Sequence, residues 1–163
     1  MTSTLVELFR HNLWANLRLI DACRGLSDAQ LDAAPAGGVF GAVRATLRHI
    51  VVNEERYLKS LLGQPLDGSS GPPAAIPSLD ELRARSQQSG EGLVAAAEKL
   101  PDGHVLQGIW DGHPYTMPAA LLFIQALNHA TEHRAQIAAV LTQIGIQPPA
   151  MDGWTFEESG MLA

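Results

Sequence analysis

The segment LNHATEHRAQI, residues 127–137, places two histidines four positions apart between apolar residues at helical spacing. Apolar residues recur at intervals of three and four on both sides of it, so we expect one long helix from about Pro118 to Gly145. At 100° per residue, His129 and His133 lie about 40° apart on that helix, on the side that carries its apolar residues. Both imidazoles are therefore expected to point toward the interior of the protein.

Three earlier segments have the same helical period, at about residues 3–25, 42–62 and 78–100. Each is followed or ended by a glycine or a proline, the residues that most often interrupt helices. Ser78 and, three residues later, Glu81 form the signature of a capping box at the start of the third segment. Four long amphipathic helices with no alternating strand pattern predict an all-α protein, a four-helix bundle.

The connections between these helices follow from composition. Ser27 is expected to cap a short helical turn, and residues 104–118 to form an irregular or hairpin-like crossover around the turn DGHP. The segment GQPLDGSSGPPAAIP, residues 63–77, is long enough for an overhand crossover, so the order of helix directions stays open at this point. The C-terminal tail is expected to dock through Trp154 and Phe156.

The composition is that of one folded domain spanning residues 1–163, with 46% apolar and 17% charged residues. The net charge is -6 and basic residues do not cluster, which argues against nucleic acid and against anionic membranes as partners. Cys23 is the only cysteine, so no disulfide forms within the chain, and we expect it to be a small buried residue. With no signal-peptide pattern and no apolar run of about 18 residues, we expect a cytoplasmic protein.

The histidine pair has two interpretations. Two neutral imidazoles buried side by side need partners for their ring nitrogens, and a divalent cation satisfies one nitrogen from each. Hydrogen bonds to core Asn, Gln or carbonyl groups satisfy them as well, so spacing alone does not decide between the two.

Catalytic zinc-type centres usually take three protein ligands. His49 is the best third ligand, because it lies at the edge of its helical stripe beside small residues that leave room for an ion.

The other histidines are expected to face solvent. His104 and His113 fall in the crossover, and His11 lies away from the apolar stripe of its helix. The letters HATEH, residues 129–133, also match the H-x-x-E-H zinc motif of inverted metalloproteases. Only 30 residues follow this motif and no further ligand-bearing helix is readable there, so we treat the match as chance.

Four residues are candidates to act beside such a metal. Glu132 is a candidate general base, although a solvated charge flanking the site is the simpler interpretation. Trp14, Asn16 and Asn53 are candidates to line the pocket. Interhelical hydrogen bonding for the two asparagines, and core packing for the tryptophan, are the alternatives.

Three stretches resemble the DinB-like (YfiT-like) metalloenzyme family. They are ANLRLIDACRGLSDAQLD (residues 15–32), GAVRATLRHIVVNEERYL (41–58) and GIWDGHPYTMPAALLFIQALNHATEHRAQIAAVLTQIGIQPPAMD (108–152). The similarity runs from about residue 10 to residue 156, nearly the whole chain, and is strongest in the helix that carries the histidine pair.

The family pattern has one histidine in the second helix and two in the fourth, which fall on His49, His129 and His133. The resemblance implies an up-down-down-up four-helix bundle, often a homodimer. It also implies a three-histidine centre that usually holds zinc or nickel, with the remaining positions taken by water or substrate. One departure is Ala135, where the family commonly has glycine after His-Arg, and we expect no loss of metal from it.

Relatives in this family include thiol-dependent transferases and isomerases and proteins described as metal-dependent hydrolases. The resemblance therefore implies a metal-dependent enzyme that activates water or a low-molecular-weight thiol for a small-molecule substrate. Two alternatives stay open: a non-catalytic metal-binding or stress-response bundle protein, and a structural bundle whose histidines pair in the core. Imidazole ligands suit zinc, nickel, copper and iron alike, so the sequence does not choose the metal.

Overall fold

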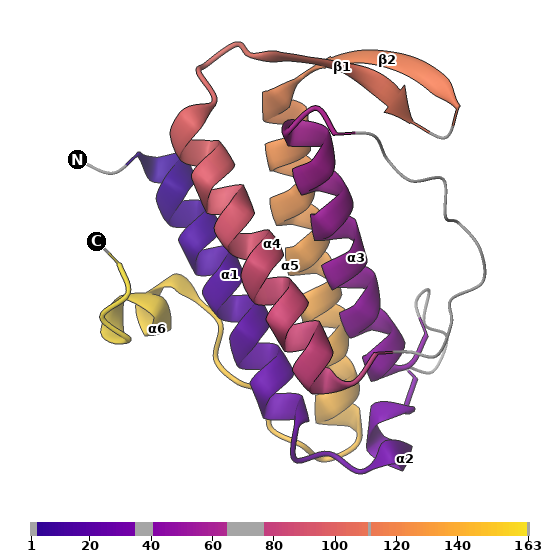
Figure 1. The fold of residues 1–163 in the computed structure, drawn as a ribbon. Helices are drawn as coiled ribbons and strands as arrows, with labels where there is room; N and C mark the ends of the chain where they lie inside the picture. The colour runs from indigo at the N-terminus through magenta and orange to yellow at the C-terminus, as the bar shows by residue number, and fades with distance from the viewer. Residues whose placement is uncertain (1–2, 35–40, 65–76, 111, 163) are drawn as a thin grey trace.

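Most of the chain is helical in the structure, a computed structural model that describes residues 3–34, 41–64, 77–110 and 112–162 (Figure 1). The long helices are α1 (Thr4–Cys23), α3 (Val43–Leu61), α4 (Leu79–Lys99) and α5 (Ala119–Gln143). The short helices are α2 (Asp28–Leu31) and α6 (Gly153–Glu158). One antiparallel hairpin is formed by β1 (Val105–Trp110) and β2 (His113–Pro118). The predicted helical class is therefore confirmed, with a hairpin where the sequence predicted a hairpin-like crossover.

Local sequence explains where several helices begin and end. Ser27 and Gln30 form a complete capping box at α2, as expected for Ser27. At α4 the Ser78 hydroxyl accepts a hydrogen bond from the Glu81 backbone N–H, which is one of the two hydrogen bonds of the predicted capping box. This bond satisfies a backbone donor of the first helical turn. The residue Gly145, with a φ of 78°, follows α5 in the left-handed conformation that favours glycine.

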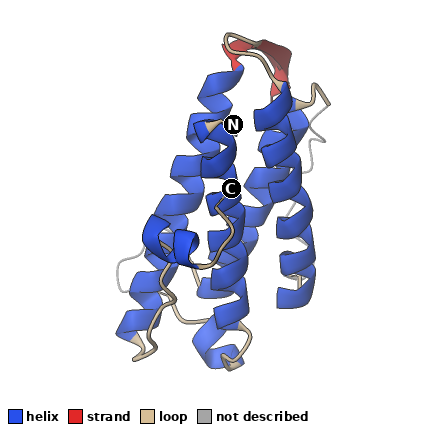
Figure 2. Ribbon diagram, turned by 90° about the vertical axis from the view of Figure 1, so that its left-hand side faces the viewer, coloured by secondary structure: helices blue, strands red, loops and turns tan. Residues whose placement is uncertain are grey.

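The long helices lie side by side around a shared apolar interior. Helix α1 contacts α4 and α5, and α3 contacts the same two helices. The hairpin crosses one end of these helices and touches α3 and α5, while α6 lies against α1 (Figure 2). Two main clusters of buried side chains each draw on all four helices. They include Leu19, Leu47, Leu82 and Ile137 in one cluster and Phe9, Tyr57, Leu93 and Phe123 in the other.

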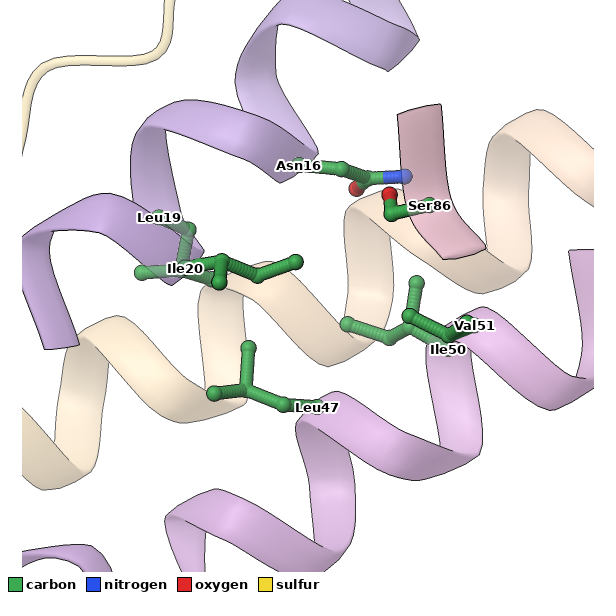
Figure 3. Close-up of a pocket in the computed structure, with 7 residues that line it drawn as sticks. All are labelled: Asn16, Leu19, Ile20, Leu47, Ile50, Val51 and Ser86. Atoms are coloured by element: carbon green, nitrogen blue, oxygen red, sulfur yellow. The ribbon is translucent and has the colours of Figure 1, made fainter. Parts of the chain in front are cut away.

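A narrow gap lies between side chains of α1, α3 and α4 in this interior (Figure 3). Aliphatic side chains line most of it, together with the polar side chains of Asn16 and Ser86. No part of the gap is wide enough for a water molecule, and no histidine is among its lining residues. The gap is therefore a packing defect and not a ligand site.

Two expectations about the face of α1 that meets the C-terminal segment were wrong. Phe156 is buried, as predicted, but Trp154 is 80% exposed. His11, expected in solvent, is partly buried, with its Nε2 atom 2.8 Å from the Met151 carbonyl oxygen and its ring edge-on to Phe156. The docked tail covers this side of α1, and the periodicity of α1 alone cannot reveal a covering segment more than 130 residues away.

Three other expectations concern burial, the membrane and the connections. Cys23 is buried, as predicted, and burial raises the pKa of its thiol to about 11, so the thiol stays protonated at neutral pH. Within the described ranges, no helix combines the length and the apolarity needed to cross a bilayer. Most of the predicted connection at 63–77, namely residues 65–76, lies outside the described residues.

Two glycines allow α4 to lie close to its neighbours. A Cβ atom on Gly90 would lie 2.5 Å from Cδ1 and 3.1 Å from Cβ of Leu13 on α1. A Cβ atom on Gly92 would lie 2.4 Å from Cδ2 of Leu58 on α3. Side-chain atoms of the neighbouring helices thus fill the space that a larger residue would need.

We expect Gly90→Val to lower the free energy of unfolding by about 1–3 kcal/mol, because the added methyl groups displace Leu13. Urea unfolding followed by circular dichroism measures this loss. Gly153→Val is the matched control, since no atom lies within 4 Å of a Cβ at that position. Equal losses in the two variants would contradict the explanation by close helix approach.

Candidate metal centre

Three histidines from two helices meet at the interface of α3 and α5. His49 lies within α3, and His129 and His133 lie one turn apart on α5. The Nε2 atom of His129 is 3.0 Å from Nε2 of His49 and 3.2 Å from Nε2 of His133. Taking one ring nitrogen from each residue, the three atoms lie within 4.8 Å of one another. The structure therefore brings together the three histidines that the sequence selected, and this histidine trio could hold a metal ion.

The hydrogen bonds around the histidine trio fit a metal site. His133 Nδ1 lies 2.8 Å from the side-chain oxygen of Gln136, so Nδ1 carries the proton and Nε2 presents a lone pair. His129 Nδ1 is buried and has no partner among the described residues, so the outer hydrogen bond typical of a metal-binding histidine is present at His133 and not at His129. Three Nε2 atoms facing one another cannot all pair among themselves, whereas one cation accepts a lone pair from each. Such a donor set suits a divalent transition metal.

Burial favours the neutral form of His49 and His129. Desolvation, reinforced by the charges that His133 and His49 would carry, lowers the pKa of His129 to about 4. Desolvation also lowers the pKa of His49, with smaller contributions from His133 and Arg48. The neutral imidazole is the form that binds metal, so at neutral pH these two rings need not lose a proton before an ion binds.

The histidine trio is covered on one side and open on another. The buried Tyr57 ring meets the His129 ring edge-on, with a centroid distance of 5.8 Å. Asn53 donates a hydrogen bond to the His49 backbone carbonyl at 2.8 Å, and its amide nitrogen lies 3.3 Å from Nδ1 of the same histidine. His49 and His129 are partly exposed, whereas His133 is buried. A small molecule would therefore approach the site from the side of His49 and His129.

The remaining predicted site residues have other surroundings. Glu132, the candidate base, is exposed on α5. The Trp14 ring is buried and packs against Phe156 in a small cluster with the C-terminal segment. Asn16 is buried and bonds to charged groups in the interior. Of the three predicted pocket-lining residues, only Asn53 contacts the histidine trio in the described hydrogen bonds.

A buried polar network joins α1, α3 and α5. The side-chain amides of Asn12 and Asn16 on α1 donate to Oε1 of Glu54, at 2.7 and 2.8 Å. Their oxygens accept from Nη1 of Arg134, at 2.6 and 2.7 Å. The Nη2 atom of Arg134 donates to the Thr131 hydroxyl at 2.9 Å. The asparagines and the two charged residues are at most 5% exposed, so water does not compete for these hydrogen bonds.

This network was not predicted from the sequence, although the sequence contains a signal for one of its members. Glu54 lies on the apolar stripe of α3, at helical spacing after Leu47 and Ile50 and before Tyr57. A charged residue at such a position must either break the stripe or find partners in the core. Noting that position would have identified one member of the network, but not its partners on two other helices.

Burial changes the acid–base properties of the network. It raises the pKa of the Glu54 carboxyl to about 7, against the opposing effect of the hydrogen bonds from Asn12 and Asn16. It also lowers the pKa of the Arg134 guanidinium to about 10, which leaves this group charged at neutral pH. The interior thus holds one lasting positive charge and one carboxyl that titrates near neutrality.

The raised pKa of Glu54 means that the folded protein holds this proton more tightly than the unfolded chain. We expect its contribution to the free energy of unfolding to be largest below pH 4.5 and to fall by roughly 3 kcal/mol as the pH rises through 7. Glu54→Gln removes this contribution and leaves the histidines titrating in both proteins. The wild-type stability minus that of the variant, from urea unfolding at several pH values, should therefore decline with pH. A difference that is constant across this range would contradict the prediction.

Family membership follows from comparison with known proteins. The chain matches the family model described as the DinB family over residues 1–161. No curated protein matches it. The family match includes α3 and α5 with their three histidines, and it agrees with the resemblance carried by the sequence motifs. Because it spans nearly the whole sequence, the chain belongs to the DinB family.

Proposed function

We propose that this DinB-family protein is a metal-dependent enzyme whose histidine trio binds a divalent ion, zinc or nickel. The observation that carries the proposal is the convergence of three Nε2 atoms, with contacts of 3.0 and 3.2 Å, from two separate helices. Both metal-dependent hydrolases and thiol-dependent transferases occur among the relatives that the sequence resembles. The proposed reaction is therefore hydrolysis, or transfer of a low-molecular-weight thiol, on a small-molecule substrate.

A divalent ion with three neutral imidazole ligands lowers the pKa of a bound water toward neutrality, or binds a thiol as thiolate. The residues of this chain orient and shield the site. Gln136 accepts the Nδ1 proton of His133, which fixes the ring and directs its Nε2 atom inward. Tyr57 covers one edge of His129 and keeps water from that side.

Glu132 is the proposed proton acceptor. It is exposed on α5 and lies between the two histidines of that helix in sequence. A carboxylate at the solvent edge is suited to take a proton from a water or thiol that enters there.

We also propose a four-helix bundle with an up-down-down-up order, working as a homodimer. In Figure 1 the colours progress in one direction along α1 and α5 and in the opposite direction along α3 and α4, which supports this order. Leu121 and Ile124 on α5 are 50% and 58% exposed, an apolar surface that a second copy could cover.

Untagged protein is expected to bind about one zinc or nickel ion per chain, the stoichiometry of a mononuclear centre. His129→Ala removes one of three ligands and is expected to weaken binding by more than about 100-fold, beyond the loss typical of an outer-shell residue. Chelator competition measures the affinity. His113→Ala, in the exposed strand β2, is the matched control and should bind as the wild type does. Absence of binding in all three proteins would leave the structural-bundle interpretation.

Metal-loaded protein is expected to hydrolyse esters, or to join electrophiles to low-molecular-weight thiols, in a screen of both reactions. Glu132→Gln should lower kcat by about 100-fold if this carboxylate is the base, with unchanged metal content. Full activity in this variant would remove Glu132 from the mechanism. A fully metal-loaded protein that is inactive in both screens would favour the alternative, a non-catalytic metal-binding or stress-response bundle protein.

A further inference from the structure

The network formed by Asn12, Asn16, Glu54 and Arg134, called here the Asn–Glu–Arg network, connects the two helices that carry the histidine trio. Its carboxylate comes from α3 and its guanidinium from α5. Two asparagine side chains of α1 lie between these charged groups and bond to both. The network supplies none of the three nitrogens that could bind metal, so its role must be indirect.

Each asparagine uses both ends of its amide. The nitrogen of Asn12 donates to Glu54 while its oxygen accepts from Arg134, and Asn16, one turn along α1, repeats this arrangement. The four hydrogen bonds, 2.6–2.8 Å long, meet at one carboxylate oxygen and one guanidinium nitrogen. Because an amide has its donor and its acceptor on different atoms, turning or sliding α3 against α5 breaks bonds on one side or the other.

The network lies close in sequence to ligands on both helices. Glu54 follows His49 by five residues on α3, and Arg134 directly follows His133 on α5. Fixing Glu54 and Arg134 therefore fixes the rotation and height of both helices near the histidine trio. Metal–nitrogen bonds of about 2.0–2.1 Å tolerate little displacement, so this register decides whether three imidazoles can share one ion.

We propose that the Asn–Glu–Arg network positions the metal ligands, by holding α3 and α5 in the relative register at which His49, His129 and His133 converge. This inference rests on the proposed metal-binding function of the trio. Stability alone does not explain the network, because replacing buried charged groups with apolar side chains of similar size is often neutral or stabilising. Directional hydrogen bonds between buried polar groups instead specify one arrangement among several that apolar packing would allow. In this network those bonds are the four at Oε1 of Glu54 and Nη1 of Arg134, whereas Oε2 of Glu54 has no partner among the described residues.

Variants at Glu54 separate positioning from stability. Glu54→Leu leaves the asparagines and the guanidinium without their carboxylate. The double variant Glu54→Leu/Arg134→Met removes both charged groups, and is expected to be more stable than Glu54→Leu because no buried charge is left unpaired. Glu54→Gln keeps an oxygen that accepts hydrogen bonds at this position. Leu82→Ala, which opens a cavity at a fully buried leucine of the core, is the destabilised control.

Zinc affinity by chelator competition, and the visible spectrum of Co²⁺-loaded protein, are measured well below the Tm of every variant. We expect Kd to rise by about 10–100-fold in Glu54→Leu and in the double variant, as for outer-shell residues of metal sites, with an altered Co²⁺ spectrum. Glu54→Gln and Leu82→Ala should stay close to wild type. The proposal would be overturned if Glu54→Leu and the double variant Glu54→Leu/Arg134→Met both kept the wild-type zinc affinity and Co²⁺ spectrum. It would also be overturned if Leu82→Ala lost as much zinc affinity as Glu54→Leu.

Imidazole ¹⁵N signals of metal-free protein give a second readout that does not depend on metal. The ring signals of the histidine trio are expected to shift in Glu54→Leu and not in Leu82→Ala, because the 3.0 and 3.2 Å contacts depend on helix register. If wild-type protein binds no zinc while these shifts occur, the proposed function fails and the positioning inference survives. Unshifted ring signals in Glu54→Leu overturn the inference whatever the metal result.

Discussion

The buried charged groups of Glu54 and Arg134 depend on hydrogen bonds from other side chains, because both residues are at most 5% exposed. The interior gap beside Asn16 and Ser86 is too narrow for a water molecule. A charge placed in such a medium is costly unless several hydrogen bonds stabilise it. The Asn–Glu–Arg network supplies four short hydrogen bonds to Oε1 of Glu54 and Nη1 of Arg134, and these bonds connect α1, α3 and α5.

Helical periodicity predicted the long helices, since each buries a continuous apolar stripe and ends at a residue that disfavours helix. Spacing selected His129 and His133 as a pair, because two imidazoles at i and i+4 point the same way on one helix. His49 was the best third candidate from its position, and the family resemblance supported the same choice. Neither argument could identify Glu54 and its partners as a network, because their hydrogen bonds join residues of three different helices. The errors at His11 and Trp154 have the same origin, because docking of the C-terminal segment on α1 is a tertiary contact.

The four long helices divide their tasks. Helices α3 and α5 supply all three histidines, while α1 supplies the asparagines that hold those two helices. Helix α4 supplies no ligand, and its glycines let side chains of α1 and α3 approach its backbone. The candidate site therefore lies between two helices that are both hydrogen-bonded to a third helix, α1, through Asn12 and Asn16.

Arg134 and His129 lie on the same helix, α5, but have different polar surroundings. The Arg134 guanidinium donates hydrogen bonds to two asparagine oxygens and to a threonine hydroxyl. This buried cationic group therefore has protein partners. Around His129 it provides instead two further imidazoles, and the buried Nδ1 atom has no partner among the described residues. If the histidines only filled the core, we would expect similar side-chain amides or hydroxyls to bond their ring nitrogens. Nitrogen atoms directed at one another are the arrangement expected when the partner is a cation shared by all three rings.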